Sequence, residues 1–273
     1  MLNEKNILVL GSKKGSKLPN IKVDMIYSAN GAAERALFYK KLYPDVPHTS
    51  IIGGKYFMEC PPVKERVIKS KPDKLIVRLG PIKIPDELAN NNCEIIQWDH
   101  KKDFDIQSRF YKFGWLDIVF GEVKFYEDKF LTRLRHFYRC IRHRGFLGGS
   151  TGFFAIFFAA MKHPSSNIIT SGIGLVEGTR YYQPDNTYGW MSKGDMKFAK
   201  KKGVVLTEHP DSNVDSFYIA SGIGLNKFNN TSRFRVERFL AKRIKKLYKN
   251  RIISLDQDFI DNACGKLWQG ETF

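Results

Sequence analysis

The stretch Gly148–His163, GGSTGFFAIFFAAMKH, decides the fold, together with PSSNIITSGIGL, which follows it directly. A glycine-rich turn with Ser150 and Thr151 opens a helix that is apolar on every side, which is typical of a core helix. Asn167–Thr170 then predicts a buried strand that ends in a second glycine turn, Ser171–Gly174. A helix start rich in Ser, Thr and Gly offers N–H groups and hydroxyls to an anion. This order of elements predicts an α/β sheet with an anion site beside a central strand.

Upstream, the first hundred residues alternate apolar strands with helical segments. Strands are expected at Ile7–Leu10, Val23–Ser28, Ser50–Ile52, Lys74–Leu79 and Cys93–Trp98, and helices at Ala32–Leu42, Pro62–Ser70 and Asp86–Asn91. Strands separated by helices indicate a parallel sheet. The predicted class is therefore α/β: a Rossmann-like, doubly wound parallel sheet with an inserted helical lid and a basic C-terminal helix.

Composition divides the chain into four parts. Residues 1–100 form the first Rossmann-like half. In residues 101–147 aromatic and basic side chains interleave, which favours an inserted lid; the alternative is a helix packed on the sheet with a solvated basic face. Residues 148–228 form the second, ligand-binding half. Residues 229–273 are expected to be helical, and Arg233–Lys249 can place its apolar residues on one face of a cationic helix.

The net charge of +17 indicates a polyanionic neighbour: a nucleic acid, an anionic membrane face or an acidic glycolipid. No RRM, KH, helix-turn-helix or zinc pattern supports a nucleic-acid partner. The four cysteines show no CxxC spacing, so we expect reduced thiols and no zinc site. The apolar run Phe146–Met161 is shorter than the roughly 20 residues of a membrane span, and the start lacks a signal-peptide core. These features predict a cytoplasmic protein.

Candidate binding residues follow the first three strands. Gly11 and Ser12 open a loop that continues as Lys13–Ser16, with neither Walker A nor GxGxxG spacing. Asn30 follows the second strand, where its amide could contact a ribose or base; the alternative is a turn-forming asparagine. Gly53 ends the third strand. For Ser150, Thr151 and Gly152 the alternative to anion binding is a simple helix N-cap, which uses the same atoms.

These motifs resemble a known family. Ser150-Thr151-Gly152, the bulky apolar helix and the strand ending in Ser171-Gly172-Ile173 are similar to the short motif of sialyltransferases, especially the small bacterial enzymes that decorate lipooligosaccharide. They also resemble a lipopolysaccharide-core protein implicated in adding Kdo. In the bacterial enzymes a glycine turn after the first strand, here Gly11-Ser12, and an asparagine after the second, here Asn30, hold the CMP part of the donor.

The resemblance implies a glycosyltransferase that moves sialic acid or Kdo from a CMP donor to a glycolipid or surface glycan such as lipopolysaccharide, with no metal and no further cofactor. It assigns donor binding to Gly11, Ser12, Asn30, Gly53, Ser150, Thr151, Gly152, Ser171 and Gly172. Tyr181 and Tyr182 lie where tyrosine hydroxyls of these enzymes bond the departing phosphate; the alternative is an aromatic pair that covers a loop.

The general base departs from the family pattern. The inverting bacterial enzymes carry a histidine where this chain reads Tyr188–Asp195 and has none. His209, expected after a strand at Val204–Leu206, is the nearest replacement, because α/β sites lie at the carboxyl ends of strands; the alternative is a structural turn histidine. Asp185 and Asp195 are weaker candidates. His163 is expected to cap the apolar helix.

Three hypotheses about the function follow from these features. The first is the glycosyltransferase, held at the inner face of the membrane by Arg233–Lys249, because basic residues attract anionic headgroups. The second is a nucleic-acid-binding α/β protein. The third is a catalytically silent, nucleotide-binding member of the same fold, because the expected base is missing.

Overall fold

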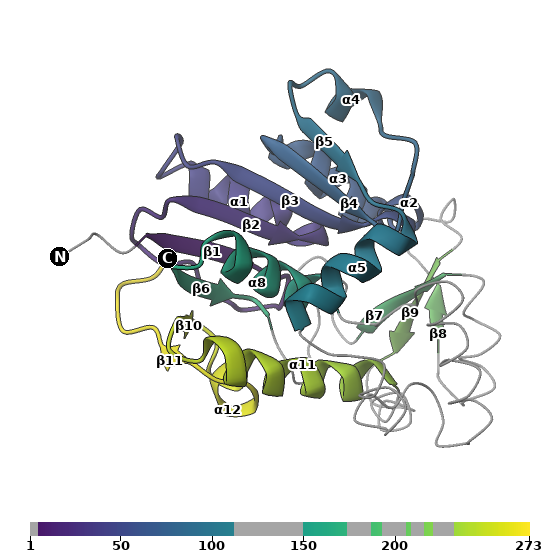
Figure 1. Cartoon of the computed structure of the whole chain (residues 1–273). Coiled ribbons are helices and arrows are strands. Elements are labelled where there is room, and N and C mark those ends of the chain that lie inside the picture. Colours follow the sequence, from purple (N-terminus) through teal and green to yellow (C-terminus); the bar gives the residue numbers. More distant parts are fainter. Residues whose placement is uncertain (1–4, 112–149, 174–186, 193–205, 209–215, 221–231) are drawn as a thin grey trace, which may run out of the picture.

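The computed structural model describes residues 5–111, 150–173, 187–192, 206–208, 216–220 and 232–273 (Figure 1). Its main feature is one eight-stranded sheet in the order β11-β10-β6-β1-β2-β3-β4-β5, in which every neighbouring pair is parallel. The strands are β1 (Asn6–Leu10), β2 (Met25–Ala29), β3 (His48–Gly53), β4 (Lys74–Arg78), β5 (Glu94–Gln97), β6 (Asn167–Ser171), β10 (Ile252–Ser254) and β11 (Lys266–Leu267).

The sheet is doubly wound, as the sequence predicts. From β1 the chain adds β2 to β5 outward on one side, and then returns to add β6, β10 and β11 on the other. The reversal falls between β1 and β6, whose last residues, Leu10 and Ser171, are register partners. Ligands of open α/β sheets bind outside the carboxyl ends of the strands at such a switch point.

Helices cover both faces of the sheet (Figure 1). On β1, Leu8 and Leu10 face the cluster that includes α1 (Ala33–Lys40), whereas Ile7 and Val9 face α8 (Thr151–Lys162) and α11 (Ser232–Tyr248). The remaining helical segments are η1 (Asn30–Ala32), α2 (Gly54–Glu59), α3 (Pro61–Ser70), α4 (Asp86–Ala89), α5 (His100–Tyr111) and α12 (Gln257–Asn262). α3 packs beside α1, and α5 packs beside α8.

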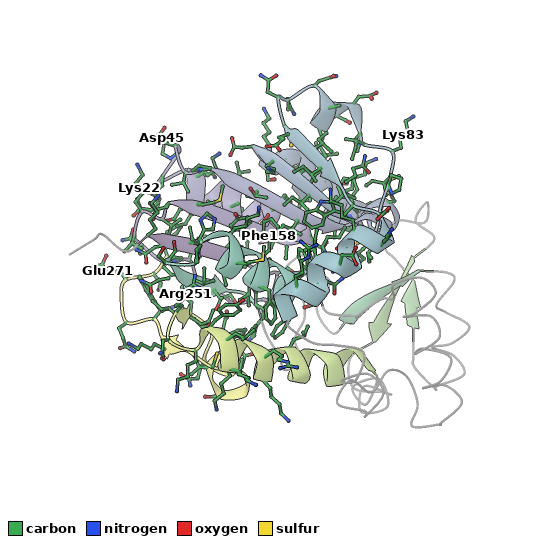
Figure 2. The ribbon with its side chains drawn as sticks, viewed as in Figure 1. Lys22, Asp45, Lys83, Phe158, Arg251 and Glu271 are labelled. Carbon is green, nitrogen blue, oxygen red and sulfur yellow. The ribbon has the colours of Figure 1, made fainter. Side chains whose placement is uncertain are left out.

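The α8 helix is the core helix that its sequence predicts. Every residue from Phe153 to Ala160 is buried, and Figure 2 shows Phe158 in the interior, whereas the exposed Lys22 and Glu271 lie at the periphery. His163 is its C-cap, and the Arg251 guanidinium donates to the carbonyl oxygen of Ala160 at 3.2 Å and to that of His163. Within the described ranges no helix is long and apolar enough to cross a membrane.

Two parts of the fold differ from expectation. The segment after residue 229 is helical only in part: α11 covers most of the helix expected at Arg233–Lys249, but β10 and β11 add two strands to the parallel sheet. A second, antiparallel sheet of order β7-β9-β8 contains β7 (Thr187–Ser192), β8 (Leu206–Glu208) and β9 (Ser216–Ala220). Of the expected lid, residues 101–111 belong to α5, which packs beside α8. Residues 112–147 lie outside the described ranges, so the choice between a lid and a helix packed on the sheet stays a prediction.

Candidate functional site at the carboxyl edge of the sheet

The predicted binding residues within the described ranges meet at the carboxyl edge of the sheet. They follow or end the four central strands and form the N-terminus of α8: Gly11, Ser12, Asn30, Gly53, Ser150, Thr151, Gly152, Ser171 and Gly172. Because α8 runs antiparallel to the strands it covers, its first turn lies at this edge. The residues predicted from the sequence therefore share one edge of the sheet. In the structure they fall into two groups along this edge.

The first half joins β2, β3 and α8. Asn30 Oδ1 accepts a hydrogen bond of 3.0 Å from Gly53 N. Asn30 adopts a left-handed conformation (φ 51°), which asparagine tolerates better than most residues. A Cβ on Gly53 would lie 3.9 Å from Thr151 Oγ1 and 3.8 Å from the Tyr56 Cβ. Gly53 thus lies beside both Asn30 and Thr151, and we call these three residues the β2–β3–α8 group.

The first turn of α8 also retains donors. Ser150 is the N-cap, and its Oγ accepts from Phe153 N at 3.4 Å, so the capping alternative is correct for this hydroxyl. Ser150 O accepts from Phe154 N. The N–H groups of Thr151 and Gly152 have no hydrogen-bond partner within the described ranges. N–H groups of this kind at a helix start attract anions.

The second half is the switch point, where the two glycine turns touch. A Cβ on Gly11 would lie 2.1 Å from Gly172 O, so no side chain fits there. Gly11 N donates to Ser171 O at 2.7 Å, and Lys13 N donates to Gly172 O at 3.0 Å. These bonds extend the β1–β6 ladder past the strands. The glycines at this point allow two backbones to meet.

Arg35, which the sequence did not reveal, fills the switch point from α1. Its Nη1 donates to Gly11 O at 2.8 Å and to Ser171 O at 3.1 Å. Its Nη2 donates to Ser16 O at 2.9 Å, Lys17 O at 3.0 Å and Ser171 Oγ at 2.7 Å. Only 6% of Arg35 is exposed. Its place beside Ala36 and Tyr39, both buried residues of α1, is a hint of burial, but the sequence does not reveal its acceptors.

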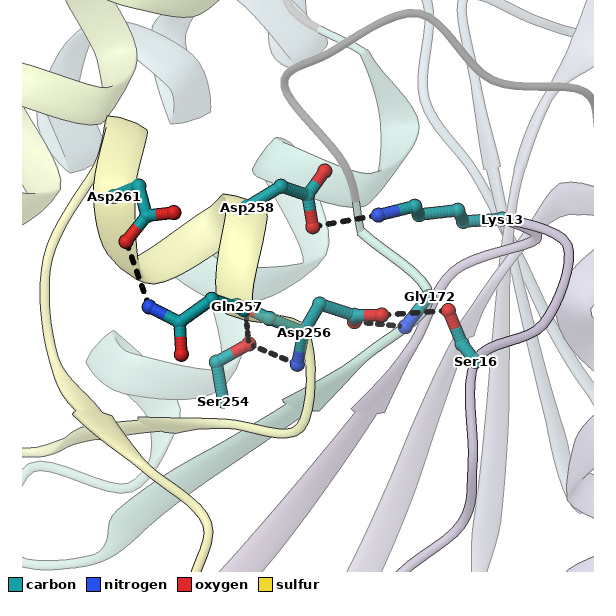
Figure 3. Close-up of polar contacts among 8 residues, drawn as sticks. All are labelled: Lys13, Ser16, Gly172, Ser254, Asp256, Gln257, Asp258 and Asp261. Atoms are coloured by element: carbon teal, nitrogen blue, oxygen red, sulfur yellow. Dashed lines mark hydrogen bonds and ion pairs between the residues drawn. The ribbon is translucent and has the colours of Figure 1, made fainter.

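Carboxylates hold the same loop from the C-terminal segment (Figure 3). Asp256 Oδ2 accepts from Gly172 N and Asp256 Oδ1 from Ser16 Oγ, both at 2.6 Å. Lys13 Nζ lies 2.6 Å from Asp258 Oδ1. These two carboxylates offset the charges of Lys13 and Arg35, so the switch point has no excess of positive charge to attract an anion. An anionic ligand is therefore better placed at the β2–β3–α8 group than at the switch point.

A buried ion pair ends the next strand. Arg78 is the register partner of Gly53, and its Nε donates to Asp103 Oδ1 at 2.8 Å. Its guanidinium carbon lies 3.9 Å from the centre of the Phe154 ring. Both side chains are almost fully buried. Asp103 thus neutralises Arg78, and the ion pair joins β4 to α5 and contacts α8 through Phe154.

Two histidines lie away from this edge. Burial lowers the pKa of His48 to about 3, and its Nε2 bonds Ser28 Oγ at 2.7 Å under α1. His163 lies at the opposite end of α8, with its Nε2 3.0 Å from Tyr27 Oη, and burial also lowers its pKa. Neither is placed to serve as a base at the carboxyl edge.

The predicted catalytic residues lie outside the described ranges. These are Tyr181, Tyr182 and His209, together with the weaker candidates Asp185 and Asp195. The strand before His209, β8, belongs to the antiparallel sheet. The end of β8 is therefore not a strand end of the parallel sheet, and the positional argument for His209 no longer holds.

No protein-family model, curated protein or solved structure matches this chain. The resemblance to sialyltransferases rests on the motifs quoted above. Within the described ranges, no cluster of three or more His, Cys, Asp or Glu side chains could hold a metal ion.

Proposed function

We propose that the chain is a glycosyltransferase that takes an acidic sugar, sialic acid or Kdo, from a CMP donor and transfers it to a glycolipid or surface glycan such as lipopolysaccharide. The observation that supports this most is the β2–β3–α8 group, in which Asn30, Gly53 and Thr151 meet at the start of a buried helix. The motifs that resemble the family's donor site either contain these residues or lie at the same carboxyl edge of the sheet.

Each member of the group has a distinct role in this proposal. The Thr151 hydroxyl and the first N–H groups of α8 bind the donor phosphate, because helix N-termini favour negative charge. The side-chain oxygen of Asn30, Oδ1, accepts from Gly53 N, so its Nδ2 is the atom that donates to the nucleotide. Gly53 keeps the space before α8 open. No metal or further cofactor is part of the proposal.

The chemistry needs an acceptor hydroxyl to lose a proton and the departing phosphate to be stabilised. The resemblance assigns the second role to Tyr181 or Tyr182. For the first role we keep His209 as the candidate base, because the histidine of the family is missing from Tyr188–Asp195. If these residues do not serve, the chain is the silent member of the fold: it binds CMP and transfers nothing.

We propose that the protein contacts the membrane through the charges of α11 and not through its apolar face. Leu240, Ala241 and Ile244 of α11 are buried in the core cluster that contains α8, so this part of the apolar face is not available to lipid. Arg251 is also occupied, at the C-terminus of α8. The proposed contact with an anionic membrane is therefore electrostatic, through the exposed lysines Lys242, Lys245, Lys246 and Lys249.

CMP is expected to raise the melting temperature more than UDP or GDP does. At a hundredfold excess over Kd, binding adds about 2.7 kcal/mol to the free energy of unfolding. In a chain of about this size, each kcal/mol raises the melting temperature by roughly 2–4 °C. Differential scanning fluorimetry with the three nucleotides measures it. Equal shifts for UDP would remove the CMP assignment, and the absence of any shift would remove nucleotide binding.

Two glycine variants locate the binding. In Gly53→Ala the new methyl meets only ordinary contacts of 3.8 and 3.9 Å, so the protein should fold normally and lose most of its CMP-dependent shift. In Gly152→Ala the methyl contacts Ile173 at 3.5 Å and the N–H is kept, so the shift should persist. A Gly53→Ala protein that binds CMP like the wild type would place the ligand elsewhere.

A further inference from the structure

We infer that Arg35 is a positioning residue: its guanidinium presets the Gly11–Ser12 peptide so that the Ser12 N–H is directed away from α1, toward the bound donor. The ligand part of this inference rests on the proposed function. The presetting of the backbone does not, and it is testable in the free protein.

The orientation follows from the planarity of the peptide bond. In a trans peptide the C=O of one residue and the N–H of the next point in opposite directions. Arg35 Nη1 holds Gly11 O on the α1 side at 2.8 Å, so the Ser12 N–H is directed to the other side. Within the described ranges Ser12 N has no hydrogen-bond partner. α8 covers that other face of β1.

The Ser171–Gly172 peptide on β6 has the same orientation, and its N–H has a hydrogen-bond partner. Arg35 Nη1 also holds Ser171 O at 3.1 Å, and the following N–H, that of Gly172, is directed away and meets Asp256 Oδ2 at 2.6 Å. The Ser171–Gly172 peptide is thus fixed at both ends. Among the residues that the structure describes, the Gly11–Ser12 peptide is held at its oxygen alone, which leaves its N–H for a ligand.

Only a guanidinium can make this set of contacts. Arg35 reaches acceptors directly after β1, on β6 and on the loop at Ser16 through two nitrogen atoms, and the planar guanidinium fixes their directions. A lysine keeps the charge but has one nitrogen, so it cannot hold Gly11 O and Ser16 O in the same geometry. Arg35→Lys therefore removes the orientation while it retains the cation.

Arg251 provides a matched control. Like Arg35, it is a partly or fully buried arginine that donates to several backbone carbonyls, in its case those of Ala160, His163 and Ser166. Those contacts lie at the C-terminus of α8, at the edge opposite the site. Arg251→Lys should perturb stability in a similar way and leave the carboxyl edge unchanged.

The test combines CMP affinity by calorimetry with amide hydrogen exchange of the free proteins, below the melting temperature of every variant. We expect Arg35→Lys to bind CMP at least tenfold more weakly and to exchange faster in residues 10–18 and 170–173. Arg251→Lys should stay within twofold of wild-type affinity and exchange normally in those segments.

Unchanged affinity in Arg35→Lys, or an equal loss in both variants, would overturn the positioning role. If the wild type binds no CMP, the proposed function fails. Amide hydrogen exchange of the free proteins then tests by itself whether Arg35 presets the backbone. Faster exchange confined to the two segments supports the presetting, and unchanged exchange refutes it.

Discussion

Gly172→Ala is expected to lower the free energy of unfolding by more than about 3 kcal/mol. Gly172 has a φ of +76°, and a Cβ there would lie 2.3 Å from Arg35 Nη1 and 2.4 Å from Gly11 O. A non-glycine residue in the left-handed region costs of order 1–3 kcal/mol, and overpacking adds about 1–3 kcal/mol. Urea unfolding followed by circular dichroism measures the loss.

Gly53→Ala is the matched control for this substitution. Gly53 has a φ of −83°, and its Cβ would meet ordinary contacts, so its unfolding free energy should stay within about 1 kcal/mol of the wild type. If Gly172→Ala were as stable as Gly53→Ala, the contact between the two glycine turns would not exist in solution.

Removal of the exposed lysines of α11, together with Lys249 directly after it, should have the largest effect on binding. Changing Lys242, Lys245, Lys246 and Lys249 to Gln is expected to weaken binding to vesicles of phosphatidylserine and phosphatidylcholine by about a thousandfold, at about 1 kcal/mol per lysine. Arg243 is left in place because it is half-buried. Sedimentation of the protein with vesicles measures the change.

The control removes the same charge elsewhere. Lys22, Lys69, Lys71 and Lys83 are exposed and lie outside α11, and their change to Gln should weaken vesicle binding far less. Binding should also fall with salt, because the Debye length shrinks from about 10 Å at 0.1 M to about 3 Å at 1 M. Equal losses in both variants would refute a role for α11, and RNA binding without vesicle binding would favour a nucleic-acid partner.

The sequence predicted the parts of the fold that depend on local pattern. The apolar α8, its Ser150 cap, the strand at Asn167–Ser171 and the glycine turns are all where periodicity and turn residues place them. Parallel strands end at one edge, so residues that follow different strands, such as Asn30 and Gly53, could be predicted to meet.

Other features depend on contacts between distant segments, which a single sequence does not show. Ser16 and Asp256 lie 240 positions apart and still form one hydrogen bond. β10 has three residues, Ile252–Ser254, and so short an apolar run cannot be told from the end of a helix by its period. Arg35 appears as an ordinary helix residue until its five acceptors are known.

The central claim is that a CMP donor binds at the β2–β3–α8 group, and amide hydrogen exchange with and without saturating CMP tests it most directly. The account predicts slower exchange in residues 11–13, 28–33, 51–56 and 150–154, and no change in residues 160–168 at the opposite end of α8. Protection at that opposite end, or no protection at the carboxyl edge while CMP is bound, would contradict it.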